Sequence, residues 1–86
     1  MNKRKLALGN KNMIGHRVTE ARLQIEMKQT ELLAKLQLKG IEISIPALSL
    51  LEGQKRPVSD FEISALSDIL DVDINWLMGK DSKNSK

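Results

Sequence analysis

The sequence predicts an all-α fold of five helices in one small domain. Apolar residues recur at spacings of three and four in successive segments, which is the periodicity of amphipathic helices. Residues that start and stop helices separate these segments, and neither a strand pair nor an internal repeat is visible. The 86 residues suffice for one domain, and leucine and isoleucine must form its core because only 2% of the residues are aromatic.

The first helix follows a basic arm. Residues 1–12 read as this flexible arm, residues 13–79 as the folded domain and residues 80–86 as a polar, disordered tail. Asn12 is the expected cap of the first helix. Its inward stripe is expected to consist of Ile14, Val18, Ala21 and Ile25.

The second and third helices are separated by a short extended link at residues 41–43. The second runs from Gln29 to Leu38 and ends before Gly40. The side chains expected to turn inward from it are Leu32, Leu33, Leu36 and Leu38.

The start and the end of the third helix can be predicted from the residues at its boundaries. Ser44 is a good N-cap, Pro46 falls in the first turn, where its missing N–H costs little, and Gly53 can leave the helix with positive φ. The inner face is expected to consist of Ala47, Leu48 and Leu51.

The fourth and fifth helices close the domain. A capping box at residues 59–62 starts the fourth, which continues through Ile63, Leu66, Ile69 and Leu70. Residues 71–73 cap the short fifth helix. Its apolar cluster is large for so small an element and consists of Ile74, Trp76, Leu77 and Met78.

Composition excludes several kinds of site. The chain has no cysteine and one histidine, so thiolate zinc sites and disulfides are impossible and no metal or other cofactor is expected. His16 is expected on the polar side of its helix, and no nucleophile, base or phosphate loop is recognisable, so we do not expect an enzyme. No segment reaches the roughly 20 apolar residues of a membrane helix. We expect a cytoplasmic protein that contacts no membrane.

Charge is distributed unevenly. Residues 1–19 carry five bases and no acid, whereas residues 57–79 carry five acids and no base. Such polarity suits a nucleic-acid binder that docks through one face, although charge clusters are also common on solvated surfaces.

These features together resemble the phage-repressor-like helix-turn-helix family of the Cro/C1 or XRE type, over roughly residues 13–79. The residues that carry the resemblance are Arg22, Gln29, Ser49, Glu52-Gly53, Arg56, Pro57 and residues 72–79. The resemblance implies a compact lambda-repressor-like domain with a helix-turn-helix, which binds double-stranded DNA and regulates transcription, most often as a repressor of bacterial or phage origin.

The resemblance also implies roles for single residues. Gln29 and Ser44 would approach the DNA backbone at helix N-termini, as would the linker residues Gln54, Lys55 and Arg56. Simple helix capping is the alternative for Gln29 and Ser44. Arg22 and Glu52 would form a structural ion pair, either buried or as a looser, exposed contact.

The outward face of the third helix departs from the family pattern. It should consist of Ile45, Pro46, Ser49 and Leu50. This face offers methyl contacts and one hydroxyl but no side chain for bidentate hydrogen bonds to bases. Specificity could come from Lys3, Arg4 and Lys5 in the arm and from DNA shape, or the helix could bind a protein.

Two functions therefore remain open. The preferred one is a sequence-specific transcriptional regulator that binds double-stranded DNA as a homodimer, with Ile74, Trp76, Leu77 and Met78 at the dimer interface. The alternative is an antitoxin-like or antirepressor-like module that uses the third helix against a protein partner. For Trp76, an anchor within the monomer core is the alternative to a dimer contact.

Overall fold

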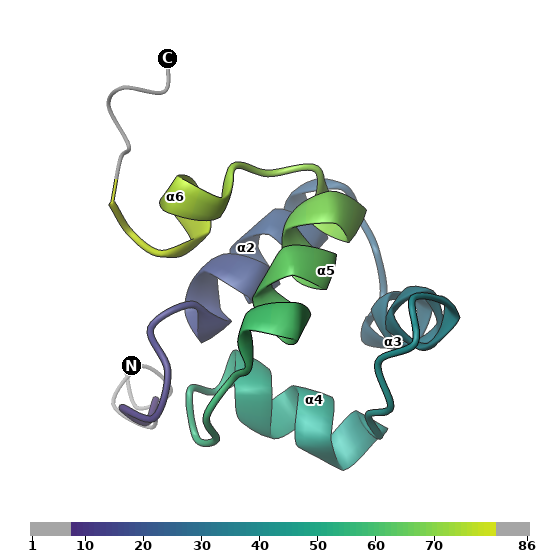
Figure 1. Ribbon diagram of the computed structural model, residues 1–86, viewed down its shortest axis with the longest axis horizontal. Coiled ribbons are helices and arrows are strands. Elements are labelled where there is room, and N and C mark those ends of the chain that lie inside the picture. Colours follow the sequence, from purple (N-terminus) through teal and green to yellow (C-terminus); the bar gives the residue numbers. More distant parts are fainter. Residues whose placement is uncertain (1–7, 81–86) are drawn as a thin grey trace.

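In a computed structural model, which describes residues 8–80, the chain forms five α-helices and no strand over that range. The helices are α2 (Gly15–Gln24), α3 (Gln29–Leu38), α4 (Ile45–Glu52), α5 (Asp60–Leu70) and α6 (Ile74–Leu77). Helix α5 packs against α2, α3 and α6, while α4 lies at one end of the molecule and α6 at the other (Figure 1). The expected all-α class is confirmed.

Side-chain caps start three of the helices where the sequence predicts. Ser44 Oγ accepts a hydrogen bond from the Ala47 amide at 3.3 Å. Ser59 and Glu62 form the expected reciprocal capping box, with N···O distances of 3.2 and 2.9 Å. Asp73 accepts from the Asn75 amide at 2.6 Å and starts α6. These local hydrogen bonds explain why the helix starts are readable from the sequence.

Three expectations about single positions are wrong. Ile25 is 51% exposed because α2 ends at Gln24 and the chain turns there. Leu38 is 86% exposed because two positions along a helix correspond to roughly 200° of rotation, which places it opposite the buried Leu36. Gly53 has an ordinary φ of −84°. The left-handed residue is instead Gln54, with φ of 60°, one position later in the turn.

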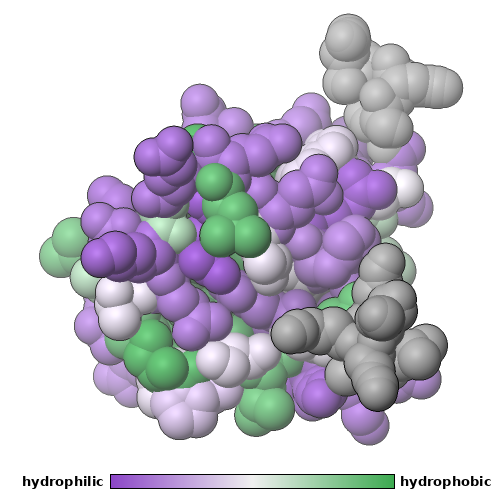
Figure 2. Space-filling view, turned by 180° about the vertical axis from the view of Figure 1, so that it is seen from behind, coloured by the Kyte–Doolittle hydropathy of each residue, from purple (hydrophilic) through white to green (hydrophobic). Residues whose placement is uncertain are grey.

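The surface carries scattered apolar side chains. Figure 2 shows separate hydrophobic spots on a mainly hydrophilic face, several of them toward the end where α4 lies. Among the described residues, the most exposed large apolar side chains are Leu38 at 86% and Phe61 at 78%. Single exposed apolar residues are common on soluble domains, so these spots do not by themselves define a site.

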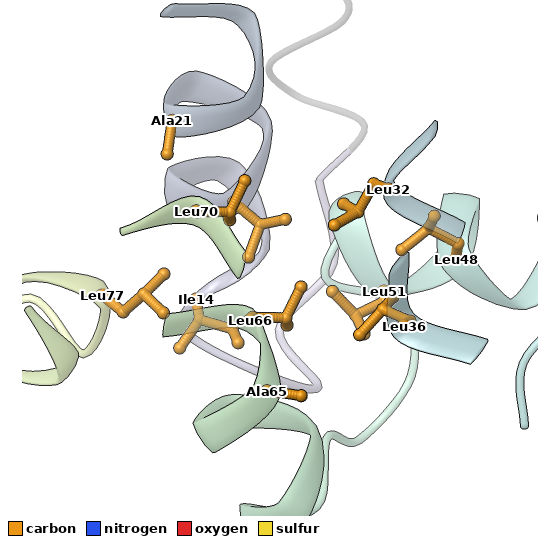
Figure 3. Packing of buried hydrophobic residues seen from close by; sticks show 11 residues of the cluster. Ile14, Ala21, Leu32, Leu36, Leu48, Leu51, Ala65, Leu66, Leu70 and Leu77 are labelled. Carbon is orange, nitrogen blue, oxygen red and sulfur yellow. The ribbon is translucent and has the colours of Figure 1, made fainter. Parts of the chain in front are cut away.

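The core lies between α2, α4 and α5, with contributions from α3 and α6 (Figure 3). Its fully buried side chains are almost all leucine, isoleucine or valine, as the low aromatic content requires. Fully burying one such side chain stabilises a fold by about 1.5–3 kcal/mol. The core residues are Ile14, Val18, Ala21, Leu32, Leu36, Leu48, Leu51, Ala65, Leu66, Leu70 and Leu77.

Within residues 8–80, every helix is too short or too polar to cross a lipid bilayer. The same range holds no cluster of histidine, aspartate and glutamate side chains that could bind a metal ion.

Candidate nucleic-acid interface

Helix α4 presents one face to solvent. Pro46, Ser49 and Leu50 are exposed, and Ile45 is half-buried. The opposite face is anchored by Leu48 and Leu51, which are completely buried. The period of the helix thus divides α4 into a core side and an outward side, and the outward side consists of the residues that the sequence predicts.

A buried carboxylate holds α4 to α2. Glu52 is 8% exposed, and its two oxygens accept hydrogen bonds from Arg22 Nε at 2.9 Å and Arg22 Nη2 at 3.0 Å. Thr19 Oγ1 donates to the same carboxylate at 3.1 Å. Arg22 is 12% exposed and also donates to the Met27 carbonyl. The expected ion pair between Arg22 and Glu52 is therefore formed, and it is buried and not a looser, exposed contact.

The same carboxylate connects α3 to the outward face of α4. Gln29 Nε2 donates to Glu52 Oε1 at 3.2 Å, and Ser49 Oγ donates to Gln29 Oε1 at 3.3 Å. Gln29 is half-buried, and one Nε2 hydrogen has no partner within residues 8–80. Gln29 therefore positions α4 as well as lying at the N-terminus of α3, the place expected for a phosphate contact.

Polar side chains of α2 and of the segment just before it face the end of α4. Asn12 accepts from the Ile14 and Gly15 amides and donates to the Leu51 and Arg56 carbonyls, at 2.8–3.1 Å. A Cβ at Gly15 would lie 2.3 Å from the Leu51 carbonyl oxygen, so this approach requires glycine. The sequence indicates Asn12 only as a helix cap, and it does not predict the close contact at Gly15.

Of these polar residues, Thr19 and Arg22 belong to α2 and lie three positions apart, while Asn12 precedes the helix. A spacing of three keeps Thr19 and Arg22 on one side of α2. It is the signal in the sequence that could have indicated a second, polar contact of α2.

Two of the three linker residues expected at DNA have partners within the described chain. Gln54 donates to the Gly9 carbonyl at 3.3 Å and accepts from the His16 amide at 3.2 Å. Arg56 pairs with Glu62 at 3.1 Å, with 28% and 11% of the two side chains exposed. These contacts tie the linker to the chain before α2 and to α5. Lys55 is exposed, whereas Gln54 and Arg56 are half-buried and also have these structural contacts, and the contact of all three with DNA stays a prediction.

The expected DNA contacts Lys3, Arg4 and Lys5 lie outside the described residues. The described chain begins at Leu8, beside the end of α4, where Gly9 N donates to the Gly53 carbonyl at 2.9 Å. Lys11 N donates to the Gln54 carbonyl, also at 2.9 Å.

Exposed lysines border the outward face of α4. Lys28 precedes Gln29 at the start of α3, Lys55 follows α4, and Lys11 is joined to the same linker by its backbone. No ion pair within residues 8–80 involves any of these three lysines. The three ammonium groups are therefore not held in ion pairs of the described chain, although the Glu31 carboxylate lies close to Lys28, whose backbone N donates to it at 2.7 Å.

The predicted dimer cluster is divided by the fold. Leu77 is completely buried in the monomer core, so its assignment to a dimer interface is wrong. Trp76 and Met78 are half-buried, and the Arg17 guanidinium lies 4.9 Å from the centre of the Trp76 ring. Ile74 is 44% exposed and is the member of the cluster most available for a partner.

His16 is exposed, as expected, and its ring nitrogen Nδ1 lies 3.4 Å from Gln54 Oε1.

Comparison of the chain with protein-family models, with curated proteins and with solved structures finds no match.

Proposed function

We propose that this chain is a transcriptional regulator that binds double-stranded DNA, with α3 and α4 as a helix-turn-helix of the lambda-repressor-like type. The observation that carries the proposal is the anchoring of α4: hydrogen bonds to Glu52 and Gln29 connect it to α2 and α3, while its far side is open. A rigid helix with one uncovered face is what insertion into a major groove requires.

Charge and helix ends support the same function. Lys28 and Lys55 flank the outward face of α4, and Gln29 and Ser44 stand at helix N-termini, where backbone N–H groups favour anions. Asp71 and Asp73 lie between α5 and α6, at the end of the molecule remote from α4 (Figure 1). Phosphates near α4 would therefore meet lysines and stay away from these two carboxylates.

The salt dependence of binding to DNA tests this proposal. Fluorescence anisotropy would compare a duplex from the chain's own upstream region with a scrambled duplex, because each neutralised phosphate adds about −0.9 to the slope of log K against log salt. Replacing Lys28 or Lys55 by alanine is expected to make the slope shallower by about 1. Lys80→Ala, beyond α6, is the matched control and leaves the slope unchanged. Equal slopes for all three variants would contradict the placement of DNA against α4.

The second candidate function is a protein-interaction module. It is favoured by the apolar character of the outward face, where Leu50 is 46% exposed beside Pro46 and the half-buried Ile45. Leu50→Lys separates the two functions. A lysine added to a helix in the major groove strengthens DNA affinity, whereas the same change in an apolar protein interface weakens capture of the partner.

A further inference from the structure

The hydrogen bonds behind α4 determine which atoms Ser49 can offer on the outward face. The chain of contacts begins at Glu52, whose carboxylate pairs with Arg22 through two N–H···O bonds of 2.9 and 3.0 Å. A carboxylate held in this way accepts hydrogen bonds and donates none. Any neutral polar group that forms a hydrogen bond with this carboxylate must therefore be the donor.

This requirement orients the amide of Gln29. Its Nε2 lies 3.2 Å from Glu52 Oε1, so the NH₂ group is the half of the amide that faces the carboxylate. The carbonyl oxygen of Gln29 is thereby directed to the other side, where Ser49 Oγ lies at 3.3 Å. The amide cannot turn over without placing two acceptor oxygens against each other.

The orientation of Gln29 in turn determines where the Ser49 hydroxyl donates its hydrogen. A serine hydroxyl has one hydrogen, and here it is donated inward to Gln29 Oε1. Ser49 is exposed, and the lone pairs of its oxygen are what remains available to a ligand. On the outward face of α4, Ser49 can accept a hydrogen bond but cannot donate one.

We infer that Ser49 reads an exocyclic amino group of adenine or cytosine in the major groove. This inference rests on the proposed DNA-binding function. Phosphate oxygens, guanine N7 and O6 and thymine O4 are all acceptors and cannot bond to an acceptor, whereas adenine N6 and cytosine N4 carry hydrogens. Ser49 is thus a specificity-determining residue and not a phosphate contact, and Gln29 is its positioning residue.

The neighbours of Ser49 on the outward face of α4 have apolar side chains, so the Ser49 hydroxyl is the polar side-chain group among them. Pro46 and Leu50 are exposed and Ile45 is half-buried, and none has a polar side-chain atom. Such side chains contact the methyl group of thymine but do not distinguish donors from acceptors. The donor-against-acceptor preference of α4 therefore depends on Ser49.

The test uses the full chain and selection of bound duplexes from a random library. Wild type is expected to enrich adenine or cytosine at one position, and Ser49→Ala is expected to lose the preference at that position, with about 2- to 10-fold weaker binding to the selected duplex. Ser49→Thr keeps the hydroxyl and should retain the preference. Gln29→Met removes the acceptor of the Ser49 hydroxyl hydrogen, so Ser49 can also donate, and guanine and thymine should then be accepted at the same base position.

A modified duplex makes the result specific to the amino group. Replacing the selected base by the nucleoside that lacks only its exocyclic amino group should weaken wild-type binding by the same factor as Ser49→Ala, and should not weaken binding of Ser49→Ala further. A purely structural role of Ser49 would lower the melting temperature and leave the base preference intact, and that result would overturn the inference.

The two proposals fail in different ways. A wild-type consensus that Ser49→Ala leaves unchanged at every position overturns the role of Ser49, while the DNA-binding function stands. Absence of binding to every duplex at low salt overturns the proposed function and this inference with it.

Discussion

At the scale of single residues, Glu52 is a side chain that connects three helices. It accepts four hydrogen bonds from Thr19, Arg22 and Gln29. Desolvation offsets much of the attraction in a buried ion pair, so its net contribution to stability is small. Its effect on geometry is larger, because one carboxylate determines how α2, α3 and α4 meet.

Removal of one partner of this pair should be costly. Arg22→Met leaves the buried carboxylate without its countercharge, and we expect the free energy of unfolding to fall by about 3–5 kcal/mol. Urea denaturation followed by circular dichroism measures it. Lys39→Ala is the control, because Lys39 and its partner Asp68 are 43% and 65% exposed and such pairs contribute about 0–1 kcal/mol. A loss for Arg22→Met no larger than that of the control would show that the pair is dispensable.

At the scale of elements, the contact of α2 with the end of α4 depends on Gly15. The carbonyl oxygens of Leu51 and Glu52 would lie 2.3 and 2.7 Å from a Cβ at this position. Both atoms belong to the backbone and cannot be displaced by a change of rotamer. Gly15 therefore sets how closely the two helices approach.

Gly15→Ala tests this close approach. Alanine is favoured over glycine by about 1 kcal/mol in a helix interior and by less at Gly15, the first residue of α2, whereas the clash must push α2 from α4 and weaken the bonds to Glu52. We expect the clash to dominate and the free energy of unfolding to fall by about 1–3 kcal/mol. Gly53→Ala is the matched control, since its nearest atom would be at 3.3 Å and its φ is ordinary. A Gly15→Ala variant more stable than wild type would contradict the packing described.

At the scale of the whole molecule, the surface at α4 and the surface at α6 lie at different ends. The end with α4 is bordered by lysines, and the opposite end carries Asp71, Asp73 and the exposed Ile74 on α6 (Figure 1). A single small head gives limited affinity for DNA, so we propose that two copies associate through α6 and bind two half-sites.

Sedimentation velocity tests this association. The wild type is expected to sediment as a dimer at micromolar concentration, and Ile74→Asp is expected to sediment as a monomer, because a charge is placed in an apolar contact. Phe61→Asp, at an even more exposed apolar side chain on α5, serves as the control and should remain dimeric. Dissociation by Phe61→Asp alone would move the interface from α6 to α5.

The sequence by itself determined the helices and most of their caps, whereas the pairing of Arg22 with Glu52, 30 positions apart, was expected only from the family resemblance. Caps and apolar stripes involve residues three or four positions apart, so their physics is local and readable. The tertiary structure alone decided that Gln54 braces the chain before α2, that Leu77 joins the core and that Gln29 orients Ser49. These contacts join residues 20 or more positions apart or depend on which neighbour covers a short helix, and helical periodicity contains no information about either.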